Sequence, residues 1–159
     1  MRVLIATDGE EPSALAERFV VDVADRTSVE TLTACVNTFE MSLQRSEAEG
    51  IDHYEPEAGA RYAAKVVREA VERLSAAGFT AGGRTAGGDA AFGLLDIIAE
   101  ERCDLAVLGA GKSRLGGLPL LGRVCRHLLL ESPCSVVLVH TWPAAEPGRR
   151  RPVLAATDG

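Results

Sequence analysis

The stretch MRVLIAT, residues 1–7, decides the fold, because it is a short and nearly continuous apolar run that stops at Asp8-Gly9. Runs of this length fit strands that are buried on both faces, as in a parallel sheet. An amphipathic segment follows from Pro12 to about Asp25, with apolar residues at helical spacing and a proline suited to a first helical turn. The chain therefore opens with a buried strand, a turn and a helix.

Apolar runs and helical patterns alternate along the rest of the chain in the same way. Strands are predicted over residues 29–36, 79–85, 104–109 and 135–140, and helices over residues 60–77, from Asp89 as N-cap onward, and over residues 123–131. This alternation predicts an α/β, doubly wound domain in which helices cover both faces of a five-stranded parallel sheet. Binding sites in such sheets lie outside the carboxyl ends of the strands, here residues 7–8, 36–37 and 109–110.

Residues 37–58 interrupt the alternation with polar and acidic sequence that contains Gly50 and Pro56. We expect a mobile crossover loop here, with a short helix around Ser42–Gln44. Loops of this length in compact domains are often lids or binding segments. This segment is therefore a candidate for a binding role.

Composition and charge limit the class of protein. The 159 residues are 47% hydrophobic and 25% charged, which is ordinary for one globular domain. The net charge of −6 argues against a surface for nucleic acid or anionic membrane, which needs clustered positive charge. No apolar stretch approaches the roughly 20 residues that span a bilayer. The four cysteines form no C-x-x-C pair and no signal peptide opens the chain, so we expect a cytoplasmic protein with reduced thiols.

The opening strand recurs at the end of the chain. Residues 1–9 read MRVLIATDG and residues 151–159 read RPVLAATDG, so six of nine positions match at an offset of 150. The basic cluster Arg149–Arg151, which follows prolines and a glycine, is typical of a solvated linker. We therefore expect a domain over residues 1–142, a linker over 143–151 and the first strand of a second repeat over 152–159. The alternative is a natural C-terminal strand that adds to a sheet edge.

The sequence LGAGKS, residues 108–113, is similar to a P-loop but does not have its spacing. A Walker A motif needs a glycine five residues before the glycine of its Gly-Lys pair, and that position is Ala106. Leu115-Gly116-Gly117 also interrupts the helix that should present its N-terminus to phosphate. The sequence argues against a P-loop NTPase. The glycine-rich stretch 109–122 is then either a phosphate cradle formed by backbone N–H groups or a flexible connector.

Four stretches together resemble the universal stress protein family over nearly the whole of the first unit. They are ATDG at 6–9, GGDAAFGLLDII at 87–98, DLAVLGAG at 104–111 and LLGRVCRHLLLESPCSVVLV at 120–139. The resemblance implies the adenine nucleotide alpha hydrolase-like fold, and tandem units are common in the family. It also implies that ATP or another adenine nucleotide is the candidate ligand.

Nucleotide-binding members of that family carry the motif G-x2-G-x9-G-[ST], which this chain keeps only in part. Gly109 and Gly122 match the first and third glycines, whereas Lys112 replaces the second glycine and Arg123 replaces the hydroxyl residue. A lysine restricts the close approach of phosphate that a glycine allows, while an arginine could grip phosphate itself. These departures imply weak or absent ATP binding.

The resemblance assigns further residues to the site. Thr7 and Asp8 sit where a first-strand carboxylate of the family contacts the adenosine part, and Val36 sits where a second-strand backbone group reads adenine. Gly111 and Val124 complete the predicted set beside the glycine motif. Asp8 alternatively serves as a turn or cap residue before the first helix.

The sequence contains no catalytic constellation. The histidines and cysteines lack the spacing of metal ligands or of a nucleophile with its base, and no Ser-Gly-Gly-x-Asp-Ser loop of a PP-loop enzyme follows the first strand. We expect a non-enzymatic stress or regulatory module that binds no metal, with an ATP-binding switch or slow ATPase as the alternative. In the family the final strand pairs across a two-fold axis, so Ser135 to His140 is expected to pair with a second copy or with the second repeat. No nucleic-acid or membrane partner is expected.

Overall fold

A computed structural model describes residues 1–38, 56–111 and 121–142, together with residues 43, 47, 114–115 and 118–119. Several features predicted above fall outside these residues. They are Lys112, the linker 143–151, the repeated strand 152–159 and most of the segment 37–58, of whose predicted short helix only Leu43 is described, as helical.

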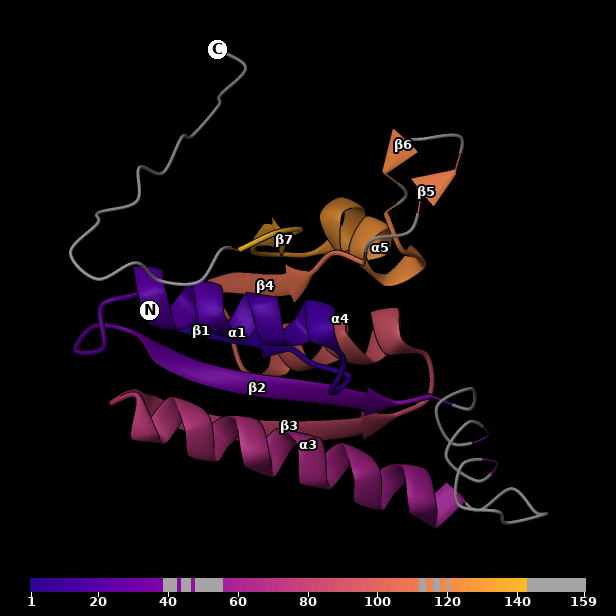
Figure 1. The fold of residues 1–159 in the computed structure, drawn as a ribbon, viewed down its shortest axis with the longest axis horizontal. Helices are drawn as coiled ribbons and strands as arrows, with labels where there is room; N and C mark the ends of the chain where they lie inside the picture. The colour runs from indigo at the N-terminus through magenta and orange to yellow at the C-terminus, as the bar shows by residue number, and fades with distance from the viewer. Residues whose placement is uncertain are drawn as a thin grey trace.

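Five parallel strands form one sheet in the order β3-β2-β1-β4-β7 (Figure 1). The strands are β1 (Arg2–Ala6), β2 (Glu30–Asn37), β3 (Thr80–Gly87), β4 (Leu105–Gly109) and β7 (Ser135–Val139). The helices are α1 (Glu11–Val23), α3 (Pro56–Ala76), α4 (Ala90–Glu100) and α5 (Arg123–Glu131). The predicted doubly wound α/β fold with a five-stranded parallel sheet is therefore confirmed.

The sheet separates two apolar layers, because successive side chains of a strand point to opposite faces. In the central strand β1, Leu4 lies in the core that α4 and α5 cover, whereas Val3 and Ile5 lie in the core that α1 covers. Helix α3 packs on β2 and β3 on the same face as α1, with Val67 against Cys35. Helices thus cover both faces (Figure 1).

The strand order places a switch point between β1 and β4. The chain passes from β1 through α1 on one face of the sheet, and from β4 to α5 on the other face. The connections that leave the carboxyl ends of these neighbouring strands therefore diverge, which opens a crevice at that edge of the sheet.

The weakest predicted strand, β3, is an edge strand whose glycines serve packing. A Cβ atom at Gly83 would collide with Cγ1 of Val67, so the missing side chain lets α3 approach the strand closely. Most of β3 is exposed, and its pairing with β2 extends from Thr80 to Gly87, two residues beyond the predicted end. Backbone pairing with β2 and the cover by α3 outweigh the poor strand propensity of glycine.

Other boundaries agree with the predictions to within a few residues. Helix α5 has the predicted limits, α1 ends at Val23 rather than Asp25, and α3 begins at Pro56, earlier than predicted.

The stretch between β4 and α5 differs from the prediction in its type of structure. The glycine-rich stretch predicted as a loop contains a two-stranded antiparallel ladder, in which β5 (Arg114–Leu115) pairs with β6 (Leu118–Pro119).

The last described residues return to α1. The indole N–H of Trp142 donates to Oδ2 of Asp22 at 2.8 Å, and its ring stands edge-on to Phe19 with centroids 4.9 Å apart. The chain after β7 is thereby fixed against the first helix. Among the described residues, none of the helices combines the length and apolarity that crossing a bilayer requires.

Candidate functional site

A pocket of about 530 Å³ opens at the carboxyl edge of the sheet, over the ends of β1, β2 and β4. The strands and the residue after β2 contribute Ala6, Ala34, Val36, Thr38, Leu108 and Gly109. The turn from β1 into α1 contributes Thr7, Asp8, Glu10, Pro12 and Ser13. The helices α3, α4 and α5 contribute Tyr62, Ala90, Leu94, Val124 and Cys125. The pocket therefore occupies the crevice at the switch point, where the strand order predicts a binding site.

The turn from β1 into α1 is held by hydrogen bonds among its own residues. The Thr7 hydroxyl donates to Oγ of Ser13 at 3.1 Å and accepts from the backbone N–H of Gly9 at 3.2 Å. The Ser13 hydroxyl, which is buried, donates to the carbonyl of Glu10 at 2.8 Å. Thr7 therefore shapes the wall of the pocket, because its hydroxyl is engaged within the turn.

Asp8 fulfils the turn role that its sequence position suggested. Its Oδ1 accepts from the backbone N–H of Glu10 at 2.9 Å, which forms an Asx turn before α1. The residue is exposed and lines the pocket, and within the described part of the chain the hydrogen bonds of this carboxylate involve Oδ1 alone. A structural role through Oδ1 and a ligand contact through Oδ2 are thus compatible.

Gly109 is required by packing at the floor of the pocket. A Cβ atom at this position would overlap the carbonyl group of Pro12, in the first turn of α1. The absence of a Cβ atom at Gly109 therefore lets the end of β4 pass directly against the start of α1. At Gly111 and Gly122 an added Cβ would meet no described atom. The first glycine of the motif is thus fixed by the fold itself, whatever the ligand.

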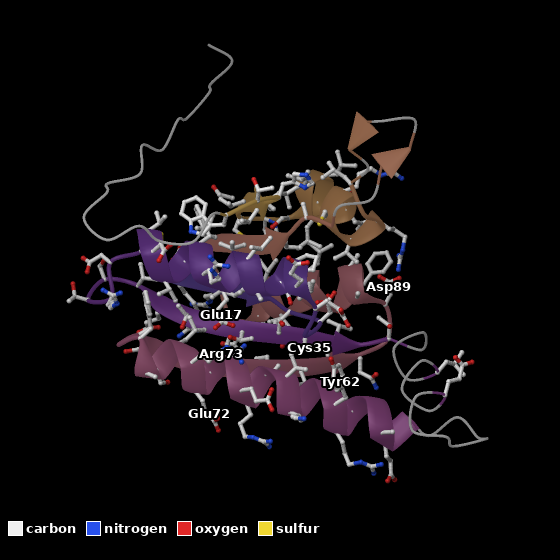
Figure 2. The ribbon with its side chains drawn as sticks, viewed as in Figure 1. Glu17, Cys35, Tyr62, Glu72, Arg73 and Asp89 are labelled. Atoms are coloured by element: carbon white, nitrogen blue, oxygen red, sulfur yellow. The ribbon has the colours of Figure 1, made fainter. Side chains whose placement is uncertain are left out.

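Tyr62 lines the pocket, although it was not among the site residues predicted from the sequence. It lies near the start of α3 (Figure 2). Its hydroxyl donates to the backbone carbonyl of Asp8 at 3.3 Å. It thereby joins the third helix to the β1–α1 turn. An aromatic residue directly before the apolar stripe of α3, at the end of the helix that faces the carboxyl edge, was the available signal.

The opposite rim of the pocket is formed by the starts of α4 and α5. Asp89 is the N-cap of α4, as predicted, and its Oδ1 accepts from the backbone N–H groups of Ala91 at 2.8 Å and Phe92 at 3.3 Å. Its Oδ2 accepts from a guanidinium N–H of Arg123 at 2.7 Å. Hydrogen bonding to Arg123, and to a lesser extent to the two N–H groups, lowers the pKa of Asp89 below its ordinary value against the effect of desolvation. Arg123, which from its sequence position could grip phosphate, is hydrogen-bonded to a carboxylate in this structure.

The cysteines near the pocket are held as thiols. Burial, followed by the negative charge of Asp8, raises the pKa of Cys35 to about 12. Burial also raises the pKa of Cys125, whose sulfur lies 3.8 Å from the carbonyl oxygen of Gly109. His127, two residues further along α5, packs edge-on to Phe92 at 5.0 Å. Over the described ranges, no three His, Cys, Asp or Glu residues group to hold a metal ion.

The structure gathers five of the predicted site residues around one pocket, namely Thr7, Asp8, Val36, Gly109 and Val124. The side chain of Val36 is buried in the core, against Gly93. Gly111, Gly122 and Arg123 lie outside the described lining. Gly122 is the N-cap of α5 and forms no side-chain cap hydrogen bond. Of the predicted site residues that the structure describes, five thus share the lining of one pocket and three of the glycine-rich region do not.

Structural comparison finds similar folds among solved proteins. The hypothetical protein MJ0577 has a TM-score of 0.71 and 21% identity, over 90% of this chain and 97% of that chain. A universal stress protein solved in complex with cAMP has a TM-score of 0.64 and 25% identity, over 88% and 96%. A universal stress protein family protein from Arabidopsis thaliana with AMP bound has a TM-score of 0.64 and 14% identity, over 87% and 90%. A search of curated proteins found no match.

The comparison with family models gives the assignment. The model described as the universal stress protein family matches residues 1–140, which include every strand of the main sheet. This agrees with the sequence resemblance and with the folds above. The chain belongs to the universal stress protein family.

Proposed function

We propose that this chain is a non-enzymatic regulatory module that binds the nucleoside end of an adenine nucleotide, with weak or absent affinity for ATP, and that acts as a pair of units. The main supporting observation is the composition of the pocket: its floor is apolar, the two charged residues of its described lining are the carboxylates Asp8 and Glu10, and that lining contains no described cation. Each part of the proposal has its own support in the structure.

The floor of the pocket suits a flat, uncharged base. Val36, Leu94 and Leu108 are buried side chains that line it, and the carboxylate of Asp8 stands at the turn above them. A volume of about 530 Å³ lies within the range of roughly 300–1,000 Å³ that ligand pockets have. A carboxylate oxygen is a strong acceptor for ribose hydroxyl groups. These features favour a nucleoside.

The charge around the pocket disfavours several phosphates. The charged residues of the described lining are Asp8 and Glu10, and both are negative. A triphosphate placed there meets like charges, and repulsion grows with each added charge. Relatives of the same fold have been solved with AMP and with cAMP, each of which carries one phosphate group. We therefore assign an adenine mononucleotide or nucleoside as the preferred ligand.

The thiols near the pocket support a binding role. A cysteine nucleophile needs a lowered pKa, and burial raises the pKa of both Cys35 and Cys125. His127, the described histidine nearest in sequence to Cys125, is packed against a phenylalanine ring. The chemistry of these groups fits a protein that binds without turnover.

Pairing is proposed through strand β7. It stands at one edge of the sheet and consists of the residues SVVLV, of which only Val139 is buried. An apolar edge strand with unpaired backbone groups is a template for another strand. In this family the final strand pairs across a two-fold axis, so we propose a second copy of the chain, or the second repeat, as the partner.

Calorimetric titration with adenosine, AMP and ATP, the last with and without Mg²⁺, tests the ligand. We expect adenosine and AMP to bind more tightly than ATP, and D8A to weaken adenosine binding by about tenfold through loss of a charge-assisted hydrogen bond. The control D96A removes an exposed carboxylate of α4 away from the pocket lining and should leave binding unchanged. Tighter binding of Mg²⁺-ATP than of AMP would favour the ATP switch instead, and no binding of any of the three would contradict the proposal.

Light scattering at several protein concentrations tests the pairing. A homodimer is expected, and a lysine in place of Val137, in the middle of β7, should convert it to a monomer. A monomer at all concentrations for the unaltered chain would contradict pairing between copies.

A further inference from the structure

We propose that the carboxylate of Asp89 competes with phosphate for Arg123 at the rim of the pocket. The site thereby discriminates against phosphorylated ligands. This inference rests on the proposed function, since it concerns which form of the nucleoside the pocket accepts. It assigns a specificity-determining role to two residues that do not line the pocket themselves.

The ion pair between Asp89 and Arg123 lies next to the pocket lining. Asp89 directly precedes Ala90, and Arg123 directly precedes Val124 and Cys125, and these three neighbours line the pocket. The pair therefore joins the starts of α4 and α5 at the rim (Figure 2 labels Asp89). A ligand group that extends from the pocket between these two helices meets this pair.

The two carboxylate oxygens of Asp89 have different hydrogen-bond partners. Oδ1 of Asp89 is fixed by the N–H groups of Ala91 and Phe92, while Oδ2 holds the guanidinium at 2.7 Å. The helix cap thus holds the carboxylate in place. Arg123 has no comparable anchor in this pair, and its side chain is 63% exposed. The arginine is therefore the partner that can turn toward another anion.

The guanidinium of Arg123 can bind either a carboxylate or a phosphate. Carboxylate and phosphate present the same kind of charged oxygen acceptors to an arginine, so the two compete for it. A phosphate that binds Arg123 either displaces Asp89 from the guanidinium N–H that it holds or binds with this acidic group beside it. An uncharged nucleoside incurs neither cost. The pair thereby lowers the affinity for AMP relative to adenosine.

The test is D89N, measured in the full chain with adenosine, AMP and inorganic phosphate. Asparagine caps a helix about as well as aspartate, so the α4 cap is retained while the competing charge is removed. We expect AMP to bind about fivefold more tightly, the size of effect typical of an exposed charge pair, and adenosine to bind as before. The matched control D96N, on the same helix and exposed, should leave both affinities unchanged.

A second readout does not depend on adenine. At equal ionic strength, inorganic phosphate should raise the melting temperature of D89N more than that of the unaltered chain, and D89N combined with R123Q should lose this gain. Absence of the extra phosphate stabilisation in D89N overturns the inference, and so does an equal gain in adenosine and AMP affinity. If no adenine compound binds any variant, the proposed function fails, while the phosphate measurement still decides the role of Asp89.

Discussion

The two sides of the pocket are built in different ways. On the β1–α1 side, the hydrogen bonds within the turn join residues two to six positions apart, from Asp8–Glu10 to Thr7–Ser13. On the α4–α5 side, the ion pair between Asp89 and Arg123 joins residues 34 positions apart. The first side includes a buried hydroxyl, whereas the second rests on an exposed charge pair. We infer that the first side is a fixed wall and that the second is the adjustable one.

On the β1–α1 side, a substitution at Gly109 should cause the largest loss of stability. G109A places a methyl group on the carbonyl of Pro12, and because the obstacle is backbone, neither segment can yield by turning a side chain. We expect a loss of about 3 kcal/mol in the free energy of unfolding, or a fall of roughly 6–12 °C in Tm, measured by urea and thermal denaturation. G111A, where the added methyl meets no described atom, is the matched control and should leave both values nearly unchanged. Equal effects of the two substitutions would show that β4 and α1 are not in close contact.

The same contrast explains what the sequence could predict. The strands, the helix limits of α5 and the N-cap role of Asp89 follow from patterns within a few residues, and these are confirmed. The Asx turn at Asp8 is equally local, since the carboxylate reaches a backbone N–H two residues on. Local features of this kind need no knowledge of the fold.

The features that the sequence did not predict depend on the topology. The pairing of Asp89 with Arg123 requires that α4 and α5 start side by side, and the contact of Tyr62 with the Asp8 carbonyl spans 54 positions. The role of Gly109 was also interpreted differently, because a glycine that admits phosphate and one that admits a neighbouring helix look alike in a sequence. A charge or a glycine shows its function only once its neighbours are known.

On the same side of the pocket, a substitution at Ser13 should cause a smaller loss of stability. S13A removes the acceptor of the Thr7 hydroxyl and the donor to the Glu10 carbonyl in a buried position. We expect a loss of about 1–2 kcal/mol in the free energy of unfolding by urea denaturation. S75A, an exposed serine-to-alanine change on α3, is the control and should shift stability much less. If S13A were no more costly than S75A, the turn would be held by its backbone alone.

On the α4–α5 side, the substitution R123Q should have the smallest effect on stability, and it should also change the pKa of Asp89. In R123Q the pKa of Asp89 should rise, because the hydrogen bond from Arg123 is the largest cause of its lowering. Since the pKa is lowered in the folded state, the stabilising contribution of this carboxylate is present above its ordinary pKa and disappears as the pH falls through the lowered value. The stability difference between R123Q and the unaltered chain should therefore exist at neutral pH and vanish in strong acid.

Carboxyl-carbon NMR shifts followed from acid to neutral pH measure this titration directly. Asp25 serves as the internal reference, because hydrogen bonds from Thr27 and Ser28 lower its pKa without an arginine, so it should titrate identically in both proteins. An unmoved pKa of Asp89 in R123Q would mean that the ion pair with Arg123 does not persist in solution. A shift confined to Asp89 would show that one exposed contact, rather than the buried turn opposite, sets the charge that an approaching ligand meets.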